Sequence, residues 1–262
     1  MPTATPTRPT PTADPHPDRP RRSIARLLVA VAVVLTLLAS GIAWYLFRPA
    51  PDAVDIQAAV DGTTETSGDT AAATASADVS GTWAVDTTVA TFSVTDTTGT
   101  FVGFRVAEEL ANLGAVEAVG RTPEVTGTVT LDGTTLTAGE ITADLTAMVS
   151  DESRREDAIQ EALGTSTSPT ATFTVTEAVD LGSDLSDGQV VDVTVPGTLT
   201  VNGVSRTVDV TMQVVRSGET VVVTGTTPVT FADFDVATPT SPIVVSLDDA
   251  GTIEFQLYLT RA

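Results

Sequence analysis

The chain has 262 residues, a formal net charge of −21 and no cysteine, so disulfide bonds and thiolate metal sites are excluded. All 13 basic residues are arginine, and the single histidine is His16. The part of the chain after His16 therefore has no Cys, Lys or His, which excludes Ser-His-Asp, Cys-His and Ser-Lys catalytic groups there. Seven arginines and 32 acidic residues follow residue 49, which gives that part a net charge of −25. A field of this sign repels phosphate backbones, and we expect no nucleic-acid binding.

The N-terminal part contains one long apolar stretch. Residues 1–26 begin with a Pro- and Thr-rich tract that has little to bury, and we expect a disordered tail. Residues 27–47 are 21 consecutive uncharged residues, and a helix rising about 1.5 Å per residue spans a bilayer core with that length. More arginines precede than follow it, so the positive-inside rule places the N-terminus in the cytoplasm. We predict a single uncleaved anchor in the cell membrane, and the alternative is a signal peptide cleaved near residues 41–43.

Residues 48–80 are rich in Asp, Thr, Ala, Ser and Gly and lack apolar periodicity, which predicts a flexible linker. A folded domain is expected over residues 81–262. Its clearest signal is residues 197–214, where two alternating apolar and polar segments flank Asn202 and Gly203, a pair that suits a type I′ hairpin turn. A lone hairpin is marginal in water, so its apolar face needs further strands to cover it.

Further alternating segments supply those strands. They lie at residues 83–85, 90–95, 101–106, 125–131, 141–147, 173–175, 221–225, 229–231 and 253–259. About eight to ten hairpin-linked strands predict an all-β domain, an antiparallel barrel or sandwich. An eight-stranded barrel has an interior just wide enough for its own side chains or one small ligand.

Two short helices are expected to interrupt the sheet, at residues 106–113 and 152–163. In the second, Ser153 and Glu156 have capping-box spacing and Gly164 suits the position after the helix. Its only apolar stripe is near its C-terminal end, so we expect it to lie across a mouth of the barrel, as a lid or as a plug.

The charged residues leave two alternatives open. Asp233 and Asp235 would point to one side of a strand, as the paired carboxylates of a glycosidase do, although aromatic residues make up only 5% of the chain. Arg121, Arg154 and Arg155 either contact a phosphate or carboxylate of a ligand or pair with nearby glutamates.

Eight short motifs follow one another in the predicted domain. They are GTWAVD at 81–86, FVGFRVAEEL at 101–110, VGRTxxVTG at 119–127, SDESRRED at 150–157, PTATF at 169–173, GxLTVNGVSR at 197–206, FADF at 231–234 and GTIEFxL at 251–257. In this order they resemble the YceI-like family of lipid-binding barrels, in the membrane-anchored form of Gram-positive bacteria. The resemblance implies a lipocalin-like antiparallel β-barrel that holds a polyisoprenoid or similar amphiphilic chain in an apolar tunnel.

The chain departs from that family in its polar residues. It lacks the histidines that many relatives carry in the first strands and after an Arg-Asp pair. Glu156 also separates Arg155 from Asp157, so the polar contact that relatives make with a ligand head group is not carried over to this chain.

We therefore predict a non-enzymatic, membrane-anchored, extracytoplasmic carrier of an isoprenoid or other long-chain lipid, with no metal and no cofactor. Burying about a dozen methylene groups contributes roughly 10 kcal/mol before ordering costs. The side chains expected to contact the ligand are Phe92, Val94, Phe101, Phe104, Val129, Leu145, Phe173, Met212, Phe231, Arg121 and Arg155. The alternative is a barrel filled by its own side chains, which would be a structural or interaction module of the cell envelope.

Overall fold

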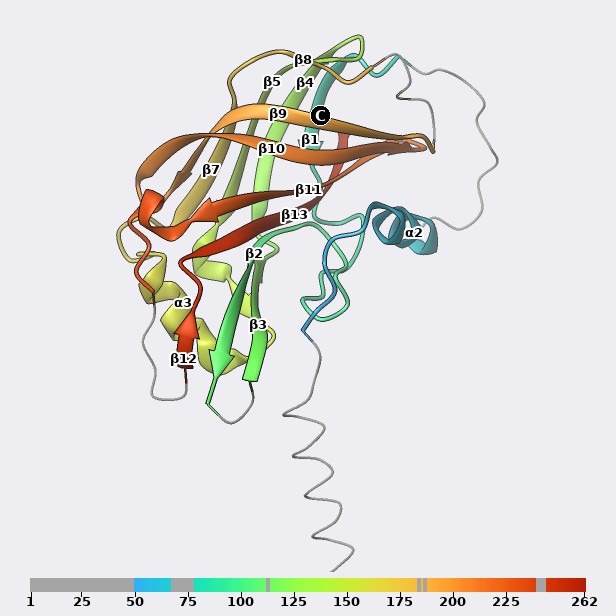
Figure 1. Ribbon diagram of the computed structural model, residues 1–262. Helices are drawn as coiled ribbons and strands as arrows, with labels where there is room; N and C mark the ends of the chain where they lie inside the picture. The colour runs from blue at the N-terminus through green and yellow to red at the C-terminus, as the bar shows by residue number, and fades with distance from the viewer. Residues whose placement is uncertain (1–49, 67–77, 112–113, 183–184, 186–187, 239–243) are drawn as a thin grey trace, which may run out of the picture. The chain divides into compact units, whose positions relative to one another are not determined.

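The computed structural model describes residues 50–66, 78–111, 114–182, 185, 188–238 and 244–262 (Figure 1). The predicted tail (1–26) and transmembrane segment (27–47) lie outside these residues. Within the described ranges, no helix combines the length and the apolar content that crossing a membrane requires.

Most of the described chain is antiparallel β-sheet. The barrel strands are β1 (Gly81–Val85), β4 (Val125–Asp132), β5 (Thr135–Asp144), β7 (Thr170–Val175), β9 (Val190–Val201), β10 (Val204–Ser217), β11 (Thr220–Thr230) and β13 (Ala250–Arg261). The other strands are β2 (Phe101–Leu110), β3 (Gly114–Thr122), β6 (Val149–Ser150), β8 (Val179–Asp180) and β12 (Val244–Leu247). The helices are α2 (Ile56–Thr66) and α3 (Glu156–Ala162), and the 3-10 turns are η1 (Leu145–Ala147), η2 (Ser153–Arg155) and η3 (Phe231–Phe234).

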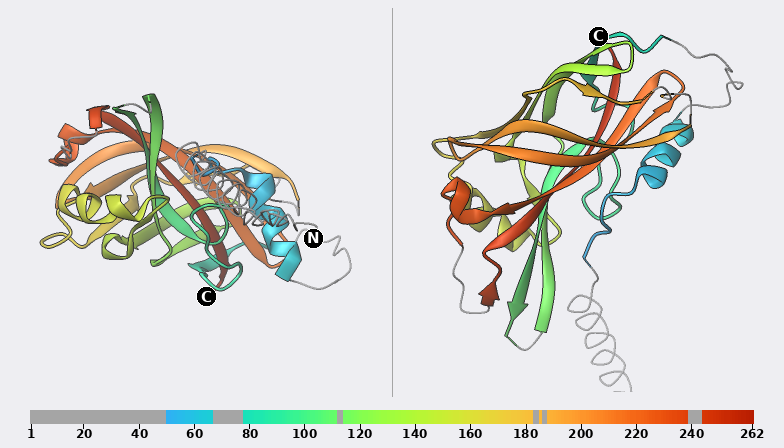
Figure 2. Two further views of the ribbon diagram at one scale, coloured as in Figure 1. Left: turned by 90° about the horizontal axis from the view of Figure 1, so that it is seen from below. Right: turned by 45° about the horizontal axis from the view of Figure 1, so that its top comes forward.

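The barrel strands follow the order β1-β4-β5-β7-β9-β10-β11-β13, and pairing of β13 with β1 closes the ring. One edge of β13 pairs with β11, whereas β1 and β2 share its other edge. The ribbon β2–β3 extends the sheet beyond the ring, and α2 and α3 lie on different sides of the barrel (Figures 1 and 2). The predicted all-β antiparallel barrel of eight strands is therefore confirmed.

The hairpin β9–β10 forms as predicted. Asn202 and Gly203 have φ angles of 50° and 75°, as a type I′ turn requires, and Val204 pairs with Val201 across it. Buried and more exposed residues alternate along the second half of β9. The hydrophobic pattern fixed this register because a slip by one residue would turn the apolar side chains to solvent.

Helix prediction failed at residues 106–113. Val106–Leu110 instead continues β2, and its pairing with β3 runs to Leu110 opposite Gly114. Two leucines three residues apart are a weak helical signal, and strand pairing overrides it. The second predicted helix does form, as η2 followed by α3, and Gly164 follows it with a φ of 62° as expected. The predicted capping box does not form, because Ser153 lies inside η2.

The predicted strand at residues 90–95 is not formed. Only a bridge between Ser93 and Thr98 is present, and Ser93 Oγ donates to Asp96 Oδ2 at 2.7 Å. Local side-chain hydrogen bonds of this kind compete with a strand ladder.

Several strand boundaries also differ from expectation, and β5 and β7 begin earlier than predicted, at Thr135 and Thr170. The predicted strand at 141–147 ends at Asp144, whose side chain accepts a hydrogen bond from Thr146 N and caps η1. The segments 221–225 and 229–231 are one strand, β11, which ends at Thr230. Pro228 is tolerated there because pairing with β10 stops at Thr226, which leaves that edge of β11 free.

Part of the predicted linker is structured instead. We call residues 51–63 the N-terminal strap, and it contains most of α2. This helix begins after Asp55, whose Oδ1 accepts hydrogen bonds from the backbone N–H groups of Gln57 and Ala58. Ile56 and Ala59 are buried against the outer face of β10, β11 and β13. Tyr258 on β13 donates its hydroxyl to Ala59 O at 2.9 Å. A few apolar residues are enough for the strap to pack on the barrel, so the sequence of the strap shows little apolar periodicity.

We predict that the strap loosens at alkaline pH. Burial raises the pKa of Tyr258 to about 12 from its usual 10.0. As pH rises, Tyr258 loses its proton at lower pH in the unfolded chain than in the folded one. The contribution of the neutral Tyr258 hydroxyl to the free energy of unfolding is therefore complete below pH 10 and is lost as pH rises toward about 12. The chain has no lysine or cysteine, and Tyr45 is its only other tyrosine.

Urea unfolding of the wild type should show a free energy of unfolding that falls by up to about 2–3 kcal/mol across this window. Tyr258→Phe should lose about 1 kcal/mol at pH 8 and show a flatter profile above pH 10, because its hydrogen bond and its proton are both gone. Tyr45→Phe serves as the control and should follow the wild type. Equal slopes for wild type and Tyr258→Phe would contradict the assignment.

Candidate functional site

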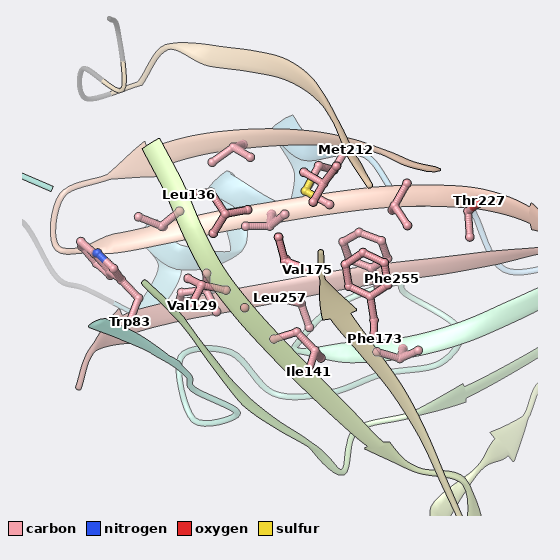
Figure 3. Close-up of a pocket in the computed structure, with 18 of the residues that line it drawn as sticks. Trp83, Val129, Leu136, Ile141, Phe173, Val175, Met212, Thr227, Phe255 and Leu257 are labelled. Atoms are coloured by element: carbon pink, nitrogen blue, oxygen red, sulfur yellow. The ribbon is translucent and has the colours of Figure 1, made fainter. Parts of the chain in front are cut away.

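The interior of the barrel contains a cavity of about 140 Å³ (Figure 3). Since one water needs at least about 10–15 Å³ of such space, there is room for roughly ten groups of water or methylene size. Every barrel strand contributes inward-facing residues, and β2 adds Val102. The lining includes Trp83, Val129, Leu136, Ile141, Phe173, Val175, Val195, Leu199, Met212, Val214, Val221, Val223, Ile253, Phe255, Leu257 and Leu259.

Polar atoms are turned away from this space. Thr227 lines the cavity, but its hydroxyl donates to Asp209 O at 3.2 Å. Trp83 likewise donates its indole N–H to Val79 O at 2.9 Å. Water needs two to four polar partners to occupy a buried cavity, so this one suits an apolar occupant.

Two phenylalanine rings of the cavity wall lie over glycines of the neighbouring strand. A Cβ atom at Gly197 would lie 2.3 Å from the ring of Phe173, and one at Gly225 would lie 2.3 Å from the ring of Phe255. Each ring thus occupies space that any larger residue on the next strand would take. The aromatic groups therefore pack onto the sheet itself.

The two ends of the cavity differ. At one end, which we call the α3 end, Ile159 of α3 is buried with Leu145 and Met148, and Phe234 of η3 packs with Leu199. These contacts place α3 across a mouth of the barrel, as the sequence predicted.

At the other end, which we call the Trp83 end, Leu181 and Leu185 pack with Trp83 in the main core cluster. The guanidinium of Arg261 lies 4.9 Å from the Trp83 ring centre. This end is therefore covered by loop residues rather than by a helix.

Three of the predicted ligand-contacting residues line the cavity: Val129, Phe173 and Met212 (Figure 3). Phe104 and Leu145 belong to the cluster beneath α3 instead. The alternating residues of β13 were missed as candidates, although their period of two marks one face of a strand. They are Ile253, Phe255, Leu257 and Leu259.

The other predicted apolar contacts lie away from the cavity. Phe101 is fully buried, but it has the opposite strand parity from Val102, which lines the cavity. Its ring lies 6.3 Å from that of Phe92, within the segment before β2. Val94 belongs to the same segment, and Phe231 begins η3.

The side chain of Arg121 lies on the outer side of the barrel, where it pairs with other residues of the chain. Its Nε donates to Glu254 Oε1 at 2.8 Å, and both side chains are fully buried. Its remaining donors reach Val94 O, Thr97 Oγ1 and Asp52 O. Burial lowers the pKa of Arg121, and the carboxylate of Glu254 opposes this shift. The guanidinium therefore holds the N-terminal strap against β13.

Two further arginines pair with acidic residues. Arg105 bonds Glu254 and Glu117 and also donates to the strap at Pro51 O. Arg155 forms ion pairs with Glu108 and with Asp151, which tie the start of α3 to β2. For Arg121 and Arg155, the structure thus shows the carboxylate pairing that the sequence left open as one of two alternatives. Nothing is described for the side chain of Arg154.

The proposed pair of carboxylates does not share a strand face. Asp233 lies in η3, and Asp235 follows it with a left-handed φ of 51°. The geometry on which a glycosidase would depend is therefore not formed. In the part of the chain that the structure covers, no group of three or more His, Cys, Asp or Glu side chains is placed to hold a metal ion.

Residues 53–259 match the YceI-like domain. The chain belongs to this family. The match includes most of the N-terminal strap, which agrees with its packing on the barrel. No curated protein matches this YceI-like chain.

Three solved structures are similar to it. A polyisoprenoid binding domain from Saccharophagus degradans, implicated in plant cell wall breakdown, is 19% identical with a TM-score of 0.52, covering 69% of this chain and 98% of the other. BcnA from Burkholderia cenocepacia is 22% identical with a TM-score of 0.46, covering 60% and 95%. The YCEI protein of Campylobacter jejuni is 16% identical with a TM-score of 0.46, covering 55% and 84%. The first of these shows that the barrel fold is shared.

Proposed function

We propose that this YceI-like barrel binds the hydrocarbon chain of a polyisoprenoid or a similar long-chain lipid. The observation that carries the proposal is the cavity of about 140 Å³, whose lining turns its polar atoms away. The similar domain described as polyisoprenoid binding supports the choice of ligand. A barrel filled by its own side chains, the alternative, has no such space.

The expected affinity follows from the size of the cavity. About ten buried methylene groups contribute roughly 8 kcal/mol at about 0.8 kcal/mol each, before the cost of ordering the chain. That sum corresponds to a Kd of about 1 μM as the upper limit of affinity, and the ordering cost weakens binding further, which suits a carrier that must also release its lipid. Binding of this kind needs no catalytic group.

The chain is further proposed to be anchored in the cell membrane by residues 27–47, with the barrel outside the cytoplasm. The N-terminal strap is fixed to the barrel from Pro51 onward, because Arg105 and Arg121 bind the backbone oxygens of Pro51 and Asp52. Residues 48–50 alone would connect it to the anchor, and three residues span at most about 10 Å.

Filling the cavity should weaken lipid binding. We predict that Met212→Trp, which adds an indole to the lining, lowers the affinity for the fluorescent lipid cis-parinaric acid at least about tenfold, equivalent to about 1.4 kcal/mol. The measurement is a fluorescence titration of the full chain in amphipol, corrected for amphipol alone. Thr211→Trp is the matched control, because Thr211 is an exposed neighbour on the same strand. Equal affinities for the two variants would contradict a site inside the barrel.

The proposed topology has its own test, for which the absence of cysteine gives a clean background. In intact cells, a membrane-impermeant maleimide should label Thr88→Cys in the barrel domain but not Thr7→Cys in the N-terminal tail. After the cells are opened, both should react. The reverse pattern, or labelling of neither in intact cells, would argue against an extracytoplasmic barrel.

A further inference from the structure

Arg216 occupies the inward face of β10 at the Trp83 end of the cavity. Val214, two residues before it, and Val221, its partner on β11, both line the cavity. Residues two apart on a strand and directly paired residues on neighbouring strands project to the same face of a sheet. The side chain of Arg216 therefore lies at the rim of the apolar space.

Among the residues that the structure describes, none supplies a counter-ion to the Arg216 guanidinium. Arg216 is only 8% exposed, its Nε donates to Gly218 O at 2.9 Å, and its Nη1 is buried without a hydrogen-bond partner. Among the described residues, no carboxylate forms an ion pair with it, whereas the buried Arg105 and Arg121 both pair with Glu254. A buried charge without a partner is costly, by several kcal/mol. An anion bound beside Arg216 would remove that cost.

The charged side chains at the two ends of the cavity differ. At the Trp83 end, Arg261 adds a second guanidinium, stacked on Trp83. Asp78, which lies near it, accepts hydrogen bonds from the backbone and hydroxyl of Ser80. At the α3 end the first turn of the helix is acidic, so an anionic group is repelled there.

We propose that Arg216 binds the anionic head group, a phosphate or a carboxylate, of the lipid whose chain fills the cavity. The proposal rests on the proposed lipid-binding function. A guanidinium offers paired N–H donors that match either oxyanion, and such charge-assisted bonds are the strong ones. The negative charge of the domain as a whole is screened beyond about 8–10 Å at physiological salt, so the local contact decides.

The test compares charged and neutral lipids with the same chain. The full chain in amphipol is given an equal mixture of geranylgeranyl phosphate and geranylgeraniol, and native mass spectrometry measures the ratio bound. We expect the wild type to favour the phosphate over the alcohol, and Arg216→Gln to lower this ratio about tenfold. Comparing variants under one condition cancels the partition of the lipids into amphipol.

Two control variants separate charge from packing. Arg206→Gln makes the same charge change at the other end of β10, where the side chain is exposed, and should leave the ratio unchanged. Arg216→Lys keeps the charge and should retain most of the preference. A second mixture, palmitate with hexadecanol, gives the same ratio of anion to alcohol for a carboxylate. The mixture in which Arg216→Gln lowers this ratio more identifies the preferred head group, a phosphate or a carboxylate.

The outcomes are distinct. A wild type without preference for either anion, or an unchanged ratio in Arg216→Gln, overturns the assignment of Arg216. The assignment is also overturned if Arg206→Gln or Arg216→Lys lowers the bound ratio of anion to alcohol as much as Arg216→Gln does. Retained binding of the alcohol by Arg216→Gln shows that the cavity is intact, whereas a wild type that binds none of the four lipids refutes the proposed function itself.

Discussion

Closure of the sheet at β13 is the constraint on which the rest of the structure depends. This strand pairs with β11 along one edge and with β1 and β2 along the other, which completes the ring. Closure gives every barrel strand a partner on both sides and gives the inward faces a shared interior. The cavity persists because the side chains that enter it, including the rings packed over Gly197 and Gly225, do not fill it.

Alternation along β13 gives the same strand two roles. Phe255 and Leu257 face the cavity, while Glu254, Gln256 and Tyr258 between and beside them face outward. The outward residues are fully or nearly fully buried as well, because the N-terminal strap and the segment before β2 cover them. A polar layer thus holds the strap outside an apolar interior, and Glu254 with its arginine partners stays on the outer side of the barrel.

Sequence periodicity predicted the barrel well because apolar and polar residues alternate along its strands, and buried and more exposed residues follow this alternation in the second half of β9. It failed where tertiary contacts override local pattern. The strap was predicted as a linker because only a few of its residues face the barrel, and its backbone oxygens, which no pattern reveals, make the contacts with Arg105 and Arg121. Alternation alone does not tell which face of a strand turns inward, so Phe101 was expected inside although Val102 lines the cavity. That Arg216 Nη1 is buried without a hydrogen-bond partner among the described residues depends on three-dimensional packing, which periodicity does not reveal.

The most direct test of an occupied interior uses Trp83, which lines the cavity and is the only tryptophan besides Trp44. In a Trp44→Phe chain, all tryptophan fluorescence comes from that site. A fatty acid brominated in the middle of its chain quenches only tryptophans that it nearly touches. The account predicts saturable quenching that ends at one lipid per chain. Binding of the brominated lipid without quenching of Trp83 would contradict it.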